Sequence, residues 1–395
     1  MRILMLAHNV AWQGSAVRAL SLARPLVRRG QEVTVVAARA EPGLARATSI
    51  VDGVTLVQPA DVLPRRVRNG GLSPIDLAGR LALAGRIEVD VVHAFEPRPA
   101  ATLPALLLRR RSEIAYVADW ADLWGPEGMA AVWPRSERWT LGSFDGWLQA
   151  RTRRSADAVT AISSGLARRA VALGVPPERV RIVPVGANDD LFRPGDPAAA
   201  RRRLGLPADS LVVVHTGFVP FDDHLLALTW ARVAEVEPRA FMLTAGRRVD
   251  ELERVAGRTG TGERLRQLGM LAYGDLDDVM AAGDVMVLPY AGNTHNDARF
   301  PNRFGDYAAA GRPVVTNPTG DLGRLVERER IGRLTAPSAD AMAAAIVALL
   351  HDPAERLALG RRARAFAEGA GSWRARAAVV EELYSELVGR SRSSS

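Results

Sequence analysis

The 395-residue chain is predicted to fold as an α/β protein with two doubly wound, Rossmann-like halves. Short apolar segments alternate with amphipathic segments of helical spacing along nearly the whole chain. The alternation breaks once, at residues 192–197 (FRPGDP), where turn residues indicate a linker. The length also suits two domains that each bury a core. Two such halves place a ligand cleft at the carboxyl ends of their strands.

The first half, residues 1–193, is predicted from apolar runs that are bounded by turn residues. Its predicted strands are Arg2–Ala7, Glu32–Ala37, Asp90–Ala94, Ile114–Ala118, Ala158–Ile162 and Val180–Val183. Its predicted helices are Gly14–Arg29, Pro99–Arg110 and Ser164–Leu173.

The second half, residues 194–372, repeats the pattern. Its predicted strands are Leu211–Thr216, Ala240–Ala245, Met270–Tyr273, Val285–Pro289 and Arg312–Thr316. Its predicted helices are Asp223–Val236, Gly262–Leu268 and Ala341–Leu350, the last with Asp340 as its N-cap. A final helix, residues 373–388, is expected to cross back onto the first half, and residues 389–395 are expected to be disordered.

The composition excludes several kinds of catalytic and structural site. The chain has no cysteine and no lysine, which excludes disulfides, a Cys nucleophile, a Lys Schiff base and a P-loop lysine. The net charge of +8 allows an anionic partner, namely nucleic acid, a membrane surface or a diphosphate. The arginines form no long basic tract, so we expect no nucleic-acid partner. The apolar run at residues 3–7 is too short for a signal peptide or a membrane span, so we expect a cytoplasmic protein.

The segment 301–315 (PNRFGDYAAAGRPVV) is the most informative part of the sequence. It predicts a loop, a short helix with Asp306 in its first turn, a stop at Gly311 and a buried strand. Free N–H groups and Arg303 can hold phosphate there, and the Asp306 carboxylate can accept two ribose hydroxyls. The alternative is a plain loop–helix–strand unit in which Asp306 complements the helix dipole.

Several motifs in order along the chain resemble one family. They are residues 30–36 (GQEVTVV), 155–163 (SADAVTAIS), 180–189 (VRIVPVGAND), 274–289 (GDLDDVMAAGDVMVLP) and 371–384 (GSWRARAAVVEELY). Together they are similar to the GT-B-fold glycosyltransferases of the retaining GT4 family, over nearly the whole chain. The resemblance implies an acceptor-binding first domain and a second domain that binds a nucleotide sugar.

The resemblance also implies roles for individual residues. Asp306 stands where the family binds the ribose, and Arg303 stands where a related subgroup has a Lys. Where the family has a further Glu for the donor sugar, this chain has Ala298, and Asn293, Asn296 or Asp297 is the candidate substitute. The residues expected to contact the donor are Gly14, Ser15, Gly217, Arg247, Met270, Leu271, His295, Asn296, Asp297, Arg299, Phe300, Pro301, Asn302 and Asp306.

One departure from the family concerns charge. The family carries two cations after the first strand of its second domain, but residues 217–224 (GFVPFDDH) contain neither. A leaving diphosphate needs positive charge in the transition state. The candidates to supply it are Arg247, Arg248, Arg299 and Arg303, of which we expect Arg303 to be catalytic.

In the first half, Gly14 and Ser15 resemble the Gly-rich turn that admits a ligand, although a plain turn explains them equally. Asp119 and Asp122 stand where the family often has a polar residue beside the reacting sugar, and they are the catalytic candidates. The alternative is that either carboxylate caps a helix or pairs with an arginine.

Five of the eight tryptophans lie between residues 120 and 147, at positions 120, 124, 133, 139 and 147. Their spacing fits no single buried helical face. They suggest an aromatic wall for a ring-bearing acceptor. A membrane-facing patch is the rival, which we do not favour because no compact arginine cluster interleaves with them.

The expected reaction is retaining transfer of a sugar from UDP or GDP to a small-molecule acceptor, without a tightly bound cofactor or metal. Composition suggests a specialised-metabolite pathway such as antibiotic biosynthesis. The alternatives are a glycosyltransferase for glycans or lipid-linked sugars at a membrane surface, a nucleotide-sugar epimerase, and a non-catalytic nucleotide-binding protein.

Overall fold

The computed structural model describes residues 1–111, 114–217 and 221–393, and it divides into two compact units. The first unit comprises Met1–Val185, the short segment Ala298–Phe300 and the C-terminal helix that begins at Trp373. The second comprises Gly186–Asp297 and Pro301–Ser372. The chain therefore leaves the first unit at Val185, before the linker predicted from its turn residues.

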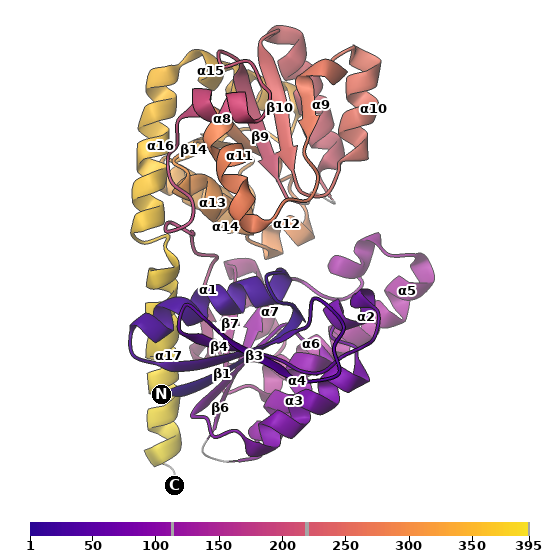
Figure 1. Ribbon diagram of the computed structural model, residues 1–395, viewed down its shortest axis with the longest axis vertical. Coiled ribbons are helices and arrows are strands. Elements are labelled where there is room, and N and C mark those ends of the chain that lie inside the picture. Colours follow the sequence, from indigo (N-terminus) through magenta and orange to yellow (C-terminus); the bar gives the residue numbers. More distant parts are fainter. Residues whose placement is uncertain (112–113, 218–220, 394–395) are drawn as a thin grey trace. The chain divides into compact units, whose positions relative to one another are not determined.

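In the described residues, the first unit is built on an eight-stranded sheet of order β3-β4-β2-β1-β5-β6-β7-β8, parallel except for the β3–β4 pair (Figure 1). Its strands are β1 (Arg2–Val10), β2 (Glu32–Ala38), β3 (Ala47–Val51), β4 (Val54–Gln58), β5 (Val91–Phe95), β6 (Ala115–Trp120), β7 (Ala158–Ala161) and β8 (Val180–Ile182). Its helices are α1 (Gly14–Arg28), α2 (Arg65–Asn69), α3 (Pro74–Arg86), α4 (Pro99–Leu108), α5 (Arg135–Trp139), α6 (Leu141–Ser155), α7 (Ser164–Ala172) and α17 (Trp373–Ser393), with short 3-10 turns at Met129–Val132 and Pro177–Arg179.

The second unit has a six-stranded, all-parallel sheet of order β11-β10-β9-β12-β13-β14 among its described residues. Its strands are β9 (Leu211–Thr216), β10 (Ala240–Ala245), β11 (Leu265–Gln267), β12 (Val285–Leu288), β13 (Val314–Thr316) and β14 (Gly332–Leu334). Its helices are α8 (Pro197–Arg203), α9 (Asp223–Val236), α10 (Asp250–Thr259), α11 (Asp277–Ala282), α12 (Thr294–Ala298), α13 (Asn302–Ala309), α14 (Gly320–Glu329), α15 (Ala339–His351) and α16 (Pro353–Glu368), with 3-10 turns at Gly262–Arg264 and Tyr273–Leu276.

The packing of each unit follows from its apolar runs. The central strands are buried on both faces, as expected for parallel sheets that helices cover. In the first unit α1 and α4 both pack on β1, and in the second α9 packs against α10 and α15 around a core that includes Trp230 and Ile346. The predicted α/β class with two doubly wound halves is confirmed.

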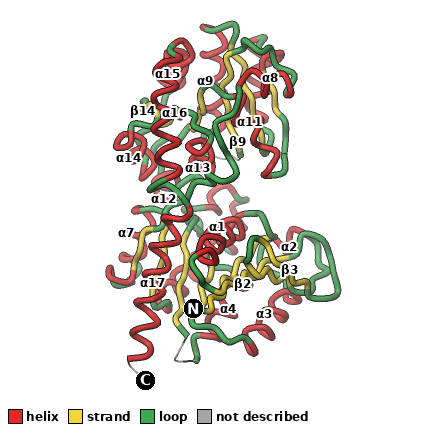
Figure 2. Tube along the Cα trace, turned by 60° about the vertical axis from the view of Figure 1, so that its left-hand side comes forward, coloured by secondary structure: helices red, strands yellow, loops and turns green. Residues whose placement is uncertain are grey.

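Helix α17 lies beside α1 in the first unit, as the tube in Figure 2 also shows. The predicted crossing-back of the last helix is therefore confirmed. The prediction that residues 389–395 are disordered is wrong as far as Ser393, because the helix continues to that residue. Gly389 costs a helix only about 1 kcal/mol, and arginines near a helix C-terminus interact favourably with its dipole. Residues 394–395 lie outside the described residues.

Four further local predictions are corrected. Residues Met270–Tyr273 form no strand, because the edge strand β11 comes earlier, and the predicted helix Gly262–Leu268 is a 3-10 turn followed by that strand. Ser338, not Asp340, caps α15, since its side chain accepts the Ala341 N–H. Asp306 lies one turn inside α13 and not in its first turn, because the helix already begins at Asn302.

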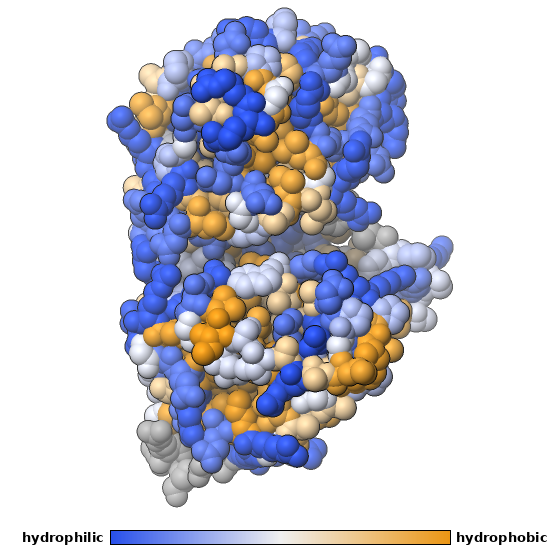
Figure 3. Space-filling model, in the orientation of Figure 1, coloured by the Kyte–Doolittle hydropathy of each residue, from blue (hydrophilic) through white to orange (hydrophobic). Residues whose placement is uncertain are grey.

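The visible surface mixes polar and apolar residues (Figure 3). Among the described residues, no helix is long and apolar enough to cross a membrane.

Candidate functional site

Asp119 lies at the carboxyl end of β6 and forms a buried, bidentate ion pair with Arg18 of α1. Arg18 Nε and Nη2 each lie 2.9 Å from one carboxylate oxygen, and the Thr160 hydroxyl donates to Oδ1 at 2.7 Å. Burial alone would raise the pKa of Asp119, but the charge and hydrogen bonds of Arg18 outweigh burial and hold the pKa below its ordinary value. The carboxylate thus has the arginine partner that the alternative interpretation required.

A chain of buried polar groups connects this ion pair to the C-terminal helix. His93 Nε2 lies 3.0 Å from the Thr160 hydroxyl, and His93 Nδ1 lies 2.6 Å from the Tyr384 hydroxyl of α17. Since Thr160 donates to Asp119, it accepts from His93 Nε2, and His93 Nδ1 accepts from Tyr384. Burial lowers the pKa of His93 to about 4, so the ring is neutral in this arrangement.

Asp122 follows in the loop after β6 and is held differently. Its backbone N–H and that of Ala121 both donate to Oε1 of Glu96, at 3.0 and 2.8 Å, and the indole N–H of Trp124 donates to Oε2. Glu96 is a buried residue with φ of 70°, which is rare for any residue except glycine. Burial and the neighbouring Asp122 raise the pKa of Glu96 to about 8.

The side chain of Asp122 is half-buried. Burial raises its pKa above the ordinary value, Arg299 lowers it, and Asp119 raises it further. Arg299 and Phe300 belong to the Ala298–Phe300 segment of the first unit, where the Ser163 hydroxyl donates to the Ala298 carbonyl. Of the two acidic candidates, Asp122 is therefore the one whose carboxylate has no bidentate arginine among the described residues.

Gly14 and Ser15 are the first two residues of α1 and end a turn that the chain itself closes. The Asn9 side chain accepts from the Ser15 N–H at 2.8 Å and from the Ser15 hydroxyl at 2.9 Å. A Cβ at residue 14 would lie 2.3 Å from Asn9 Oδ1, so this position requires glycine. The structure thus gives this turn a local explanation, with the Ser15 N–H already bonded.

In the second unit Asp306 is buried on α13 without an ion pair to any described residue. Tyr273 Oη donates to its Oδ1 at 2.7 Å, and Asn188 Nδ2 donates to the same oxygen at 2.9 Å. Among the described residues, none donates a hydrogen bond to Oδ2. Burial raises the pKa of Asp306 to about 6, although both hydrogen bonds and the charge of Arg303 act in the opposite direction.

Arg303 lies one turn before Asp306 and is oriented by a histidine. His215 Nδ1 lies 3.0 Å from the Val287 carbonyl oxygen, which only accepts, so this nitrogen carries the proton. His215 Nε2 is then an acceptor, and Arg303 Nη1 donates to it at 2.9 Å. The guanidinium also lies against Gly217, where a Cβ would be 3.3 Å from Arg303 Cζ.

Gly217 brings a second arginine to the same edge of the sheet. Its φ of 84° and its N–H bond to the Ala245 carbonyl place it directly against Gly246, whose Cβ would lie 2.6 Å from the Gly217 oxygen. Arg247, which follows Gly246, is exposed at the carboxyl end of β10. Within the segment 217–224, residues 218–220 lie outside the described residues.

The loop before α13 is held by its own side chains and by Phe221 and Asp222. Asn296 is fully buried and donates through Nδ2 to Asp222 Oδ2 at 2.9 Å and to the Ala291 carbonyl at 2.8 Å. His295 is buried with its ring 4.0 Å from that of Phe221, and the Asp297 N–H donates to the Asn293 carbonyl.

The remaining predicted contacts are scattered over the second unit. Pro301 caps α13, Asn302 begins it, and Met270 and Leu271 lie in the loop after β11, where Met270 is exposed.

Sequence reasoning missed three residues that hold these groups: Glu96, Asn188 and Tyr273. Asn188 and Tyr273 lie within or beside quoted motifs, so their polar character was a usable signal. Glu96 lies two residues after the predicted strand Asp90–Ala94, but nothing in the sequence indicates that its backbone has a positive φ.

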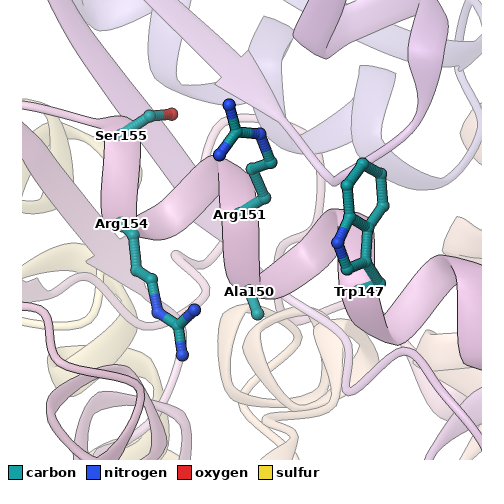
Figure 4. Close-up of a pocket in the computed structure, with 5 residues that line it drawn as sticks. All are labelled: Trp147, Ala150, Arg151, Arg154 and Ser155. Atoms are coloured by element: carbon teal, nitrogen blue, oxygen red, sulfur yellow. The ribbon is translucent and has the colours of Figure 1, made fainter.

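Two hollows on the first unit are lined by other residues. One, of about 270 Å³, is lined by Trp147, Ala150, Arg151, Arg154 and Ser155 of α6 (Figure 4). The other, of about 360 Å³, is formed around α7 and β8. In the part of the chain that the structure describes, no three His, Asp or Glu side chains gather in a way that could hold a metal ion.

Two family models match the chain, one mainly in the first unit and one mainly in the second. The model of the glycosyl transferase 4-like domain matches residues 13–186, and the model of glycosyl transferases group 1 matches residues 210–352.

Two relatives illustrate the range of similarity. The D-inositol 3-phosphate glycosyltransferase 1 of Catenulispora acidiphila is 28% identical over 387 residues, which cover 91% of this chain and 87% of that protein. The D-inositol 3-phosphate glycosyltransferase of Thermobispora bispora is 32% identical over 234 residues, which cover 54% of this chain and 52% of that protein. In the second match the chain thus spans about half the length of its relative.

Solved structures agree on the fold. Sucrose-phosphate synthase from Thermosynechococcus elongatus matches with a TM-score of 0.78 at 20% identity, over 98% of this chain and 99% of that one. The Anabaena protein HepE, solved with UDP and glucose, matches with a TM-score of 0.72 at 19% identity, over 98% and 100% of the two chains. Because the two family models together match most of the chain, it belongs to the glycosyltransferases of the GT4 type, and these solved structures show that it has the GT-B fold.

Proposed function

We propose that this glycosyltransferase takes a sugar from a UDP- or GDP-sugar that binds to the second unit, with Asp306 as the ribose ligand. The observation that carries the proposal is the environment of Asp306. Its Oδ1 is held by Tyr273 and Asn188, whereas Oδ2 receives no hydrogen bond from the described residues. A buried carboxylate without a cation is costly unless other donors satisfy it, and ribose hydroxyls supply such donors.

The diphosphate is assigned to Arg303 and Arg247. Both arise at the carboxyl edge of the sheet, next to the touching Gly217 and Gly246, where the backbone allows close approach. Two arginines there supply the charge that residues 217–224 lack in sequence. Arg303 is the catalytic candidate, because a fixed cation is worth most where charge develops on the leaving group.

For the acceptor we propose a small ring-bearing molecule bound to the first unit near Asp122. The relatives named above are D-inositol 3-phosphate glycosyltransferases, which makes a phosphorylated ring polyol the first acceptor class to test. Retention at the anomeric carbon, catalysis without a bound metal, and a cytoplasmic location belong to the same proposal. A specialised-metabolite acceptor, as in antibiotic biosynthesis, is the second candidate, and it rests on the composition and on the degenerate form of the family motifs.

Isothermal calorimetry with UDP-glucose and GDP-mannose tests the donor site. We expect one of the two to bind, and we expect Asp306→Ala to weaken binding by at least about tenfold, the loss for one charge-assisted hydrogen bond. Asp321→Ala is the matched control, because Asp321 is an acid in the first turn of another helix of the same unit. Unchanged donor affinity in Asp306→Ala would refute the ribose assignment. Conversion of the donor in the absence of any acceptor would favour an epimerase.

A further inference from the structure

The solvent side of helices α5 and α6 carries an unusual set of side chains. Four large apolar residues within nine positions are about half exposed or more: Trp139 at 59%, Leu141 at 55%, Phe144 at 48% and Trp147 at 58%. We call these four residues, together with Arg151 and Arg154, the α5–α6 patch. α5 lies at the outer edge of the first unit, away from the sheet (Figure 1).

The patch follows the helix geometry of α6. Phe144, Trp147, Arg151 and Arg154 recur at intervals of three and four residues, so they share one face of the helix. The opposite face is buried and holds Leu148 and Thr152. The helix is therefore anchored by one face, while the other presents aromatic rings and then arginines to solvent.

The aromatic residues are ordered against each other and against cations. Phe144 and Trp147 stack with ring centroids 5.9 Å apart, and the Arg138 guanidinium lies 5.5 Å from the Trp139 ring centroid. Trp147, Arg151 and Arg154 line one shallow hollow on α6, where the Arg154 side chain turns away from that of Arg151 (Figure 4) and donates from Nε to the Leu173 carbonyl at 2.6 Å. The sequence shows no compact run of arginines among the tryptophans. The helical repeat of α6 nevertheless brings Arg151 and Arg154 to the same stretch of the helix surface as Trp147.

Residues 135–154, which include α5 and α6, carry more positive than negative charge. Between residues 135 and 154 there are five arginines and two acids. One acid, Asp145, is buried and paired with Arg98 at 2.9 Å, so Glu137 is the acid that this segment exposes. A surface that combines exposed aromatic residues with arginines matches the interface of an anionic bilayer, where rings enter the headgroup region and guanidinium groups meet phosphates.

We propose that the α5–α6 patch docks the protein on the surface of an anionic phospholipid membrane. Phe144 and Trp147 insert at the headgroup level, and Arg151 and Arg154 bind lipid phosphates. The proposal does not depend on the donor assignment in the second unit, and it needs no membrane-spanning helix.

Co-sedimentation of the full-length protein with vesicles tests the proposal. Vesicles of phosphatidylglycerol and phosphatidylcholine are compared with vesicles of phosphatidylcholine alone, at low and high salt. We expect binding to the anionic vesicles only. We expect Phe144→Ser/Trp147→Ser to weaken binding at least about tenfold, and Arg151→Gln/Arg154→Gln to weaken it roughly fivefold per arginine with a smaller salt dependence.

The matched control is Leu44→Ser/Ile50→Ser, which removes two exposed apolar side chains elsewhere on the first unit. It is expected to leave vesicle binding unchanged, and circular dichroism checks that every variant folds. Failure of the wild-type protein to bind anionic vesicles would overturn the proposal, and so would an equal loss in the control. Variants that bind vesicles normally but lose turnover on a soluble acceptor would assign the patch to the acceptor.

Discussion

Asp119 in the first unit and Asp306 in the second are both buried carboxylates, but their surroundings give them opposite electrostatics. Asp119 has a bidentate arginine and a low pKa, whereas the donors to Asp306 among the described residues are neutral and its pKa is raised to about 6. The first arrangement satisfies the charge within the protein. In the second, no described residue pairs with the charge or donates a hydrogen bond to Oδ2. A buried acid is thus a better indicator of a binding site when its own protein does not neutralise it.

The largest effect is expected when the internal partner of Asp119 is removed. In Arg18→Met the Asp119 carboxylate stays buried without its cation, and breaking such a pair costs about 3–5 kcal/mol. The free energy of unfolding, measured by urea denaturation at pH 7, should fall by that amount.

Arg24→Met is the control on the same helix. Arg24 pairs with Asp52 at 2.9 Å, but both side chains are substantially exposed, so the expected loss is at most about 1 kcal/mol. Equal losses in the two variants would mean that the Arg18–Asp119 pair contributes no more than a surface ion pair.

The same substitution is expected to have opposite signs at the two acids. The folded-state pKa of Asp306 lies above its unfolded value of 3.8, so its contribution to stability is full below pH 3.8 and is lost as the pH rises through 6. Above pH 6 the buried charge opposes folding by on the order of 2–3 kcal/mol. Asp306→Asn should therefore stabilise the protein at pH 7.5, and the gain should shrink towards pH 4.

Asp119→Asn should instead destabilise the protein at pH 7.5, because it removes the carboxylate that Arg18 and Thr160 bind. Urea denaturation of both variants at pH 4.5, 6 and 7.5 makes the comparison. A loss of stability in Asp306→Asn that does not change with pH would show that Asp306 is as well compensated as Asp119.

The sequence predicted more of the fold than of the site, for physical reasons. Buried parallel strands such as Val285–Leu288 and Leu211–Thr216 are continuous apolar runs, so their positions are visible in the sequence. The short edge strand at Leu265–Gln267 has no such run, and its assignment was wrong. Asp306 and Arg303 were identifiable as a charged pair at one helix, but the neutral partners Asn188 and Tyr273 come from distant segments. Their meeting is a consequence of tertiary structure, which residue types alone do not reveal.

The smallest effect concerns the positioning of Arg303. His215→Phe keeps a buried ring at the end of β9 but removes the nitrogen that accepts from Arg303 Nη1. Since the guanidinium keeps its charge and loses one orienting hydrogen bond, we expect kcat to fall about tenfold with little change in KM for the donor. Steady-state kinetics with the donor identified by calorimetry measure both quantities.

A double-mutant cycle then separates positioning from general damage to the fold. Arg303→Ala alone should lower kcat by about 10²–10³, as removal of a transition-state donor does. If His215 acts through Arg303, adding His215→Phe to Arg303→Ala should cost nothing further, because the group that it orients is already gone. Additive losses in kcat would instead assign His215 a role that is independent of Arg303. The hydrogen bond from Arg303 to His215 would then not be what orients the guanidinium for catalysis.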